Sequence, residues 1–149
     1  MKKRILIFIS ILFIFAASLF SLELGLIAGS ITKPSEAIYG ISACSGIIIP
    51  LLKFEVEYYN LADRKFEALT AGVKLRKRFR KFAPYGVVGV GSEFDNLTFN
   101  FDEYETFFFV GGGIHLYIGG FLSLRADIRF LNFSDTNKTR LSVGAFFHL

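Results

Sequence analysis

The sequence is poor in the residues that mark disulfide-rich, metal-binding and disordered proteins. Its 149 residues include one cysteine, three prolines, one methionine and no tryptophan. A single cysteine excludes a disulfide framework within the chain and a cysteine-rich zinc site. Charged residues make up only 20% of the chain, whereas hydrophobic residues make up 52% and phenylalanine alone occurs 19 times. Such a composition is too apolar for a disordered chain, and the length allows one domain.

Positive charge at the N-terminus predicts an export signal. Residues 2–4 are Lys-Lys-Arg, residues 5–17 are wholly apolar apart from one serine, and small residues then offer cleavage after Ser18 or Ser21. This is the layout of a secretory signal peptide, although the apolar run approaches the length of an uncleaved anchor. We expect a signal peptide over residues 1–21 and one domain over residues 22–149. Removal of the signal lowers the formal charge of +4 toward neutrality, which disfavours a nucleic-acid partner.

The rest of the chain lacks a second run of 18 apolar residues, and its hydrophobic pattern has a period of two rather than 3.6. The clearest example is the segment 122–130, where the polar set Ser123, Arg125, Asp127 and Arg129 alternates with Leu122, Leu124, Ala126, Ile128 and Phe130. Similar alternation occurs over 22–29, 39–47, 52–59, 68–75, 85–94, 107–118 and 140–149. Segments of roughly 8–12 residues match tilted strands that cross a bilayer.

The connections between these segments alternate in length. Pro50, Gly119 and Gly120 mark tight turns, whereas polar stretches occupy 32–36, 60–65, 95–105 and 132–138. Short turns at one rim and longer loops at the other are typical of outer-membrane barrels. The sequence therefore predicts an all-β, eight-stranded antiparallel up-and-down transmembrane β-barrel.

The two faces of the strands differ in kind, and alternation alone does not say which face is inside. We expect the apolar face outside, because the polar face carries both signs of charge and is rich in glycine, as a narrow lumen requires. The predicted lipid-facing residues are Leu122, Leu124, Ile128, Phe130, Leu141, Val143 and Phe147. The predicted lumen charge network is Glu23, Glu55, Glu57, Lys74, Glu93, Arg125, Asp127, Arg129 and Arg140. Charges in such a space must be paired, so a salt-bridged plug is expected rather than a water channel.

Several segments resemble the small outer-membrane β-barrel families related to OmpA and OmpX. These are Pro84 to Gly91 (PYGVVGVG), Leu69 to Phe79 (LTAGVKLRKRF) and Leu122 to Phe130 (LSLRADIRF). The C-terminal strand resembles the signal that the outer-membrane assembly machinery reads, with Phe147 and Leu149 in the key places, although Leu149 stands where a terminal aromatic is usual. The resemblance implies location in a bacterial outer membrane, contact with its lipid and lipopolysaccharide, and a monomeric barrel.

Enzymes that modify lipid A also use small barrels, and they need a histidine with a serine and a carboxylate at the outer rim. The two histidines, His115 and His148, both fall toward the periplasmic ends of their strands, and Tyr117 stands where a serine would follow His115. We therefore predict no catalytic, cofactor-binding or metal-binding residues and no cofactor. The expected role is structural, adhesive or in envelope integrity. The alternatives are a lipid A-modifying enzyme and a soluble, secreted, lipocalin-like binding barrel.

Three further motifs have plain structural readings beside functional ones. Cys44 ends a sequence that imitates a lipoprotein cleavage box but lies far from the apolar run, so a small inward residue is expected. A divalent cation could bridge the acids of the longest loop (Asp95, Asp102, Glu103 and Glu105) to each other or to lipopolysaccharide phosphates, or these acids could simply be solvated. The loops could also contact an extracellular ligand. The basic run (Lys74, Arg76, Lys77, Arg78, Arg80 and Lys81) is placed on the periplasmic rim, where anionic head groups would attract it.

Overall fold

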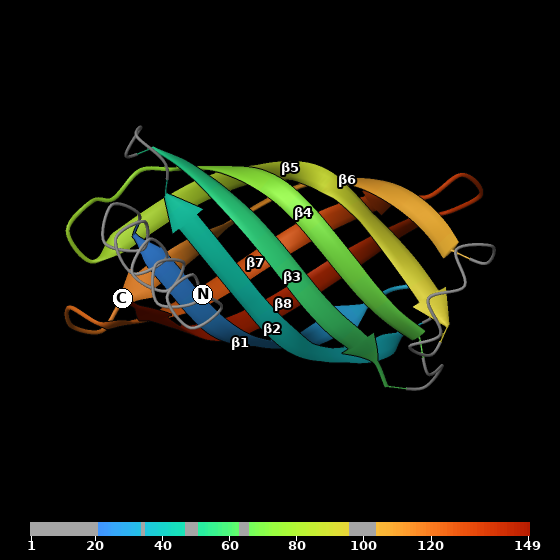
Figure 1. The fold of residues 1–149 in the computed structure, drawn as a ribbon, viewed down its shortest axis with the longest axis horizontal. Helices are drawn as coiled ribbons and strands as arrows, with labels where there is room; N and C mark the ends of the chain where they lie inside the picture. Colours follow the sequence, from blue (N-terminus) through green and yellow to red (C-terminus); the bar gives the residue numbers. More distant parts are fainter. Residues whose placement is uncertain (1–20, 34, 47–50, 63–65, 96–103) are drawn as a thin grey trace, which may run out of the picture.

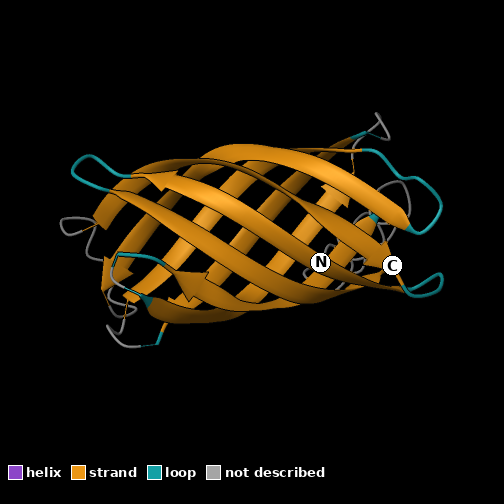
Figure 2. Ribbon diagram, turned by 180° about the vertical axis from the view of Figure 1, so that it is seen from behind, coloured by secondary structure: helices purple, strands orange, loops and turns teal. Residues whose placement is uncertain are grey.

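The chain folds into a closed β-barrel with no helix in the part that the structure describes (Figures 1 and 2). The computed structural model describes residues 21–33, 35–46, 51–62, 66–95 and 104–149. No helix among these residues is long and apolar enough to cross a membrane. The predicted signal peptide, residues 1–21, lies outside the described residues except for Ser21, and it stays a prediction.

Eight antiparallel strands follow one another around the barrel in chain order. They are β1 (Leu22–Ile31), β2 (Glu36–Gly46), β3 (Leu52–Leu61), β4 (Phe66–Arg76), β5 (Phe82–Asp95), β6 (Tyr104–Tyr117), β7 (Leu122–Asn132) and β8 (Asn137–His148). The predicted fold class, an eight-stranded antiparallel up-and-down barrel, is confirmed. Each observed strand overlaps one alternating segment of the sequence. The reason is that successive side chains of a strand point to opposite faces, so a strand with one apolar face has an alternating sequence.

The first and last strands close the sheet. β1 pairs with β2 on one side and with β8 on the other, for example through Leu24 opposite Phe147 and Ala28 opposite Val143. The backbone amide of the last residue, Leu149, also donates to the carbonyl oxygen of Leu22 at 2.9 Å. Closure removes both sheet edges, whose unpaired amide and carbonyl groups would each cost several kcal/mol in hydrocarbon.

The direction of each side chain follows the strand alternation. In β7 every odd-numbered residue from Ser123 to Leu131 is buried, and the even-numbered residues from Leu124 to Asn132 are exposed. The same order holds along β3, where Glu55 and Glu57 are buried and Phe54 and Val56 are exposed. The charged face is therefore the inner face and the apolar face is the outer one. The buried core of this protein is the lumen itself.

The two rims of the barrel are built differently. The start of β1 and the end of β8 lie at the same end of the barrel (Figure 1). With antiparallel strands, the connections β2–β3, β4–β5 and β6–β7 lie at this rim, and the other four connections lie at the opposite rim. We call the first the terminal rim and the second the loop rim. Residues 96–103 of the longest loop are outside the described part of the chain.

Candidate functional site

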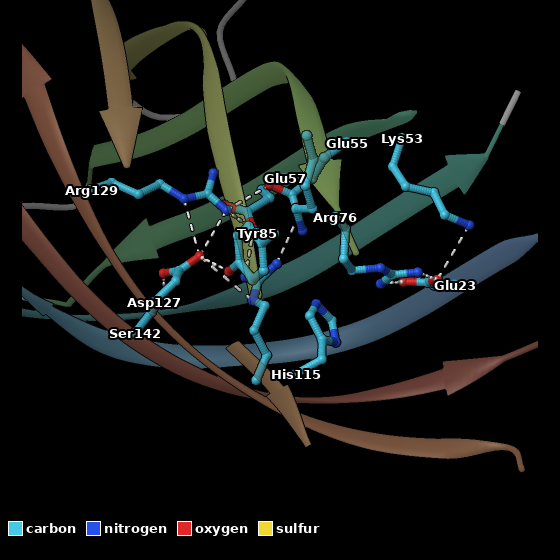
Figure 3. Close-up of polar contacts among 12 residues, drawn as sticks. Glu23, Lys53, Glu55, Glu57, Arg76, Tyr85, His115, Asp127, Arg129 and Ser142 are labelled. Carbon is cyan, nitrogen blue, oxygen red and sulfur yellow. Dashed lines mark hydrogen bonds and ion pairs between the residues drawn. The ribbon is translucent and has the colours of Figure 1, made fainter. Parts of the chain in front are cut away.

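Two carboxylates of β3 form the centre of an ion-pair cluster inside the barrel. Arg125 of β7 donates to both, from Nη1 to Glu55 Oε2 at 2.7 Å and from Nη2 to Glu57 Oε1 at 2.6 Å. Arg129 of β7 contacts the same two carboxylates, at 2.6 Å to Glu55 and 3.0 Å to Glu57. Strands β3 and β7 stand four places apart in a ring of eight, so this cluster bridges opposite walls of the lumen (Figure 3).

Asp127, between the two arginines on β7, accepts from three sides. Arg129 Nη2 donates to its Oδ2 at 2.9 Å, and the Tyr85 hydroxyl of β5 donates to the same oxygen at 2.8 Å. Ser142 Oγ of β8 donates to the other oxygen, Oδ1 (Figure 3). A charge whose lone pairs are all engaged by donors loses least from its removal from water.

Lys74 of β4 and Arg140 of β8 complete this central cluster. Lys74 Nζ pairs with Glu55 and lies 4.3 Å from the centre of the Tyr85 ring. Arg140 Nη1 lies 2.8 Å from Glu57 Oε2. The central cluster thus consists of Glu55, Glu57, Lys74, Arg125, Asp127, Arg129 and Arg140. Four positive and three negative groups, contributed by four strands, neutralise one another almost completely.

A second cluster surrounds Glu23 near the terminal rim. Arg76 donates to both Glu23 oxygens, with Nη1 to Oε2 at 2.7 Å. Lys53 Nζ lies 3.6 Å from Glu23 Oε1, and His148 Nδ1 lies 3.5 Å from the same atom. Glu23, Lys53 and Arg76 appear together at one side of Figure 3. This cluster joins β1, β3, β4 and β8 at the end of the barrel where the strand termini meet.

A third pair lies toward the loop rim. Lys138 Nζ of β8 is 3.2 Å from Glu93 Oε2 of β5 and 4.1 Å from the centre of the Phe133 ring. Both charged side chains are buried. The paired charges therefore extend along the length of the lumen.

Aromatic rings fill the space between the ion pairs. The Arg125 guanidinium lies 4.4 Å from the centre of the Phe146 ring, and those of Arg129 and Arg140 lie 5.1 Å from the Phe109 and Tyr59 rings. Cations over ring faces gain electrostatic energy where water is excluded. In all, seven basic and six acidic side chains of the described residues are buried. The geometry is that of a packed, charge-neutralised plug.

The outer face is the converse of the lumen. Of the seven predicted lipid-facing residues, Leu122 is partly exposed and the others are between 40% and 60% exposed: Leu124, Ile128, Phe130, Leu141, Val143 and Phe147. All lie on the outward positions of β7 and β8, which carry no charge. An apolar surface of this extent is a surface for hydrocarbon or for a partner, and not for water.

Comparison with known proteins agrees with this geometry. No family model matches the sequence, and no curated protein matches it. Among solved structures, the N-terminal β-barrel domain of Pseudomonas aeruginosa OprF matches with a TM-score of 0.74 and 14% identity over 87% of this chain and 97% of that one. Neisserial surface protein A matches with a TM-score of 0.56 and 16% identity over 86% and 96%. The outer membrane enzyme PagL matches with a TM-score of 0.55 and 10% identity over 83% and 97%.

The chain has the fold of the small outer-membrane β-barrels. The expected resemblance to this group is confirmed at the level of the fold. The apolar outer face and the closed sheet are those of a transmembrane barrel, and the similar solved structures include an outer membrane enzyme and de novo designed transmembrane β-barrels. Because the same fold includes an enzyme, the fold alone does not decide whether this barrel is one.

The structure buries all nine residues of the predicted lumen network, and it also buries partners that the sequence interpretation did not include. Seven of the nine belong to the central cluster, whereas Glu23 and Glu93 form separate clusters. The partners left out are Lys53, Arg76, Tyr85, Lys138 and Ser142. The alternation carries the missing signal, because each lies on the inner face of its strand.

Arg76 corrects the placement of the basic run. The basic run is predicted to lie on the periplasmic rim, but β4 continues through Arg76, so this side chain points into the lumen and pairs with Glu23. Lys74, which the sequence also predicts as a lumen residue, pairs there with Glu55. Only Lys77, Arg78, Arg80 and Lys81 remain in the turn between β4 and β5.

The two histidines lie inside the terminal rim of the barrel and share one serine. Ser123 Oγ lies 2.8 Å from His148 Nε2 and 3.1 Å from His115 Nδ1, and His148 Nδ1 in turn faces Glu23. The order serine, histidine, carboxylate is that of a hydrolase triad. Ser123 is 0% exposed, however, and the centres of the His115 and Phe146 rings are 5.3 Å apart. Its burial closes Ser123 off from solvent, whereas a nucleophile must be reached by its substrate.

The remaining motifs are resolved by position. Cys44 is a buried free cysteine on the inner face of β2. Among the acids of the longest loop, Glu105 is exposed on β6, whereas Asp102 and Glu103 lie outside the described residues. Within the described part of the chain no group of three acidic, cysteine or histidine side chains could hold a metal ion.

Proposed function

We propose that this chain is a non-enzymatic barrel of the bacterial outer membrane whose lumen is closed by paired charges. Its role is structural, in envelope integrity or in adhesion through the connections at the loop rim. The observation that supports this most is the inversion of polarity: charges pair across the lumen, and exposed apolar side chains cover most of the outer wall. A barrel of this kind anchors itself in lipid and offers its loops to the outside without conducting ions.

The same observation disfavours a soluble, lipocalin-like barrel. In such a barrel the apolar face lines a ligand cavity and the charged face meets water. Here the inner face carries Glu57 and Arg140, both fully buried, and the outer face carries Val143 and Leu141 at 60% and 50% exposure. Outer belts of this composition aggregate in water and are stable in hydrocarbon.

A lipid A-modifying enzyme is the second candidate, favoured by the contacts of Ser123 with His148 and of His148 with Glu23. The burial of Ser123 weighs against it, as does its place at the terminal rim. Mass spectrometry of lipid A from cells that express the chain, compared with cells that express the Ser123→Ala variant, separates the two. A mass change of lipid A that depends on Ser123 would replace our proposal.

Export and assembly complete the proposal. Residues 1–21 act as a cleaved signal peptide, and the C-terminal strand, with Phe147 and Leu149 on its outward side, presents the assembly signal. Both residues are exposed on the outer face, at 50% and 75%. The barrel is expected to work as a monomer in contact with outer-membrane lipid and lipopolysaccharide.

Fractionation and gel mobility test the membrane location. We expect the chain in the outer-membrane fraction, with a heat-dependent shift on SDS gels because a closed barrel resists SDS until it is heated. A folded monomer that stays in solution after removal of detergent would contradict the proposal.

Single cysteines on β7 test the polarity in a Cys44→Ala background. Cysteines at Leu124, Ile128 and Phe130 should react with a lipid-soluble maleimide and resist a membrane-impermeant one. A cysteine at Ser123 is the matched inward control and should resist both reagents in the folded barrel. Reaction of the outward cysteines with the impermeant reagent would show that water bathes the apolar face.

A further inference from the structure

The connections of the terminal rim have an unusual composition. Residues 47–51 (Ile-Ile-Ile-Pro-Leu) and 118–121 (Ile-Gly-Gly-Phe) carry no charge, and residues 77–81 (Lys-Arg-Phe-Arg-Lys) carry four positive charges and no negative one. At the loop rim, by contrast, three of the four connections contain acids: residues 62–65, 96–103 and 133–136. Positive charge without acid, beside exposed apolar side chains, is the composition of segments that settle at an anionic membrane surface.

The basic residues stand on a tight hairpin with exposed rings at its base. Phe79 and Phe82 exchange two backbone hydrogen bonds, of 2.6 and 2.9 Å, which leaves Arg80 and Lys81 as the two residues at the tip. Both phenylalanines are about half exposed, at 52% and 53%. Arg80 has a φ of 51°, a left-handed conformation that disfavours side chains other than glycine or asparagine. A cation therefore occupies a position of the turn where glycine would adopt the backbone conformation with less strain.

The fourth cation of the turn has another task. The Arg78 guanidinium lies 3.8 Å from the centre of the ring of Tyr117, an inward residue at the mouth of the barrel. Its Nε donates to the carbonyl oxygen of Arg80 at 3.1 Å. Arg78 is exposed like the other three cations, but its guanidinium is held over the ring at the mouth of the lumen. Lys77, Arg80 and Lys81 are also exposed, and their turn contains no acid.

Below this turn the outer wall is hollowed by an apolar groove of about 440 Å³. Leu51, Leu75, Pro84 and Gly86 line it, together with Lys77 and atoms of the inward residues Arg76 and Tyr85. Gly86 faces outward, and a Cβ there would meet nothing closer than the Gly111 carbonyl oxygen at 3.9 Å. The groove therefore exists because this outward position has no side chain, and not because neighbouring atoms forbid one.

We propose that the β4–β5 turn and the groove below it form a binding site for one anionic phospholipid of the leaflet nearest the terminal rim. The proposal rests on the membrane location given above. The phosphate and its headgroup lie among Lys77, Arg80 and Lys81, and one acyl chain lies in the groove against Leu75 and Pro84. Charge complementarity selects an anionic headgroup, and the groove, continuous with the hydrocarbon-facing wall, selects a lipid over a soluble anion or an acidic protein.

The test measures which lipid the purified barrel retains. The protein, extracted from membranes in detergent, is given phosphatidylglycerol or phosphatidylcholine with the same acyl chains, and bound lipids are counted by native mass spectrometry. We expect about tenfold preference for phosphatidylglycerol, since juxtamembrane cations each contribute up to about 1 kcal/mol and exposed charges are partly screened. The triple variant Lys77→Gln, Arg80→Gln, Lys81→Gln should lose this preference.

Matched variants separate headgroup from acyl recognition. Gly86→Leu fills the groove without a change in charge and should lower retention of both lipids at least fivefold. Lys33→Gln removes an exposed cation at the opposite rim, and Ala71→Leu adds nearly as much bulk to the outer face of β4 away from the groove; both should stay within twofold of the wild type.

Two results would overturn the site: equal retention of both lipids by the wild-type barrel, or a preference that survives the triple variant. Retention that survives Gly86→Leu would overturn the groove as the acyl site. The lipid site would also be overturned by a protein that copurifies by binding to this turn while the barrel shows no selectivity among lipids. Insertion into pure phosphatidylcholine vesicles, followed by the heat-dependent gel shift, reports separately on the membrane location. A barrel that inserts but shows no lipid preference loses only this inference.

Discussion

Glu57 is the residue on which most of the central cluster depends. It contacts Arg125 at 2.6 Å, Arg129 at 3.0 Å and Arg140 at 2.8 Å, and it is fully buried. Glu57→Gln leaves three guanidinium groups with one fewer counter-charge in the buried interior of the barrel. We expect a loss of about 3–5 kcal/mol in the free energy of unfolding, as for other broken buried pairs.

Urea titration in lipid vesicles, read by circular dichroism, measures this loss in a chain that lacks tryptophan. Glu105→Gln, at an exposed position of β6, is the control and should change the free energy of unfolding by less than about 0.5 kcal/mol. Adding Arg140→Gln to Glu57→Gln should recover part of the loss, because it removes one of the stranded charges. Equal stability of Glu57→Gln and the wild type would mean that the cluster does not stabilise the barrel.

Two glycines give opposite predictions for the same substitution. A Cβ at Gly29, on the inner face of β1, would lie 2.0 Å from the Leu141 carbonyl oxygen and 2.7 Å from the Ser142 Cα, both backbone atoms of β8. Gly29→Ala should therefore cost about 1–3 kcal/mol through strain between β1 and β8. Gly86→Ala meets open space and should be neutral or stabilise by up to about 1 kcal/mol. Thermal unfolding of both variants in one detergent checks the contrast, and a similar loss for both would contradict it.

At the level of the strands, the sequence predicts well which side chains point into the lumen, but it predicts poorly which of them form ion pairs with one another. The alternation of β7 places Arg125, Asp127 and Arg129 inward, as the structure has them. It does not indicate that Arg125 reaches Glu55, 70 residues earlier, because contacts across a lumen depend on the tilt and stagger of all eight strands. Arg76 shows the same limit, since its partner Glu23 lies 53 residues away. A run of basic residues also predicts a solvated turn unless the end of β4 is known.

Closure between β1 and β8 predicts a specific cross-link. Ala28 and Val143 are direct partners on the outer face. Their Cβ atoms should therefore be about 4.5–5.5 Å apart, within reach of a slightly adjusted disulfide. In a Cys44→Ala background, the pair Ala28→Cys and Val143→Cys should form a disulfide on mild oxidation and change mobility on non-reducing gels.

The pair Ala28→Cys and Ala145→Cys is the control for register. Ala145 lies opposite Leu26, two residues from Ala28, so its Cβ is about 7–8 Å away on a diagonal and should not cross-link efficiently. Efficient cross-linking of the control pair, with none of the first pair, would shift the register of closure by two residues.

For the whole molecule, the sequence predicts the membrane-spanning architecture better than it predicts the biochemical function. Hydrophobic periodicity, connection lengths and the terminal strand all derive from the requirement that a sheet in lipid be closed and apolar outside, so they predict the barrel together. Nothing in that requirement constrains the sequences of the connections at the loop rim. The lipid site proposed at the terminal rim depended on Gly86 and Arg80, whose significance lies in an open outward position and a positive φ that no sequence pattern expresses.

The filled lumen predicts that the barrel does not conduct. Buried arginines and rings of β5 to β8 occupy the interior, and the three ion-pair clusters follow one another from the terminal rim to the loop rim. An ion would have to break pairs such as Arg125 with Glu57 to pass, and each broken pair exposes an uncompensated charge. We expect no stepwise current when the folded barrel is inserted into planar bilayers. Insertion must be shown on the same sample by the heat-dependent gel shift, so that the absence of current can be attributed to a closed lumen and not to a barrel that failed to insert. Steady single-channel steps from the wild-type barrel would mean that the clusters line a path instead of closing one.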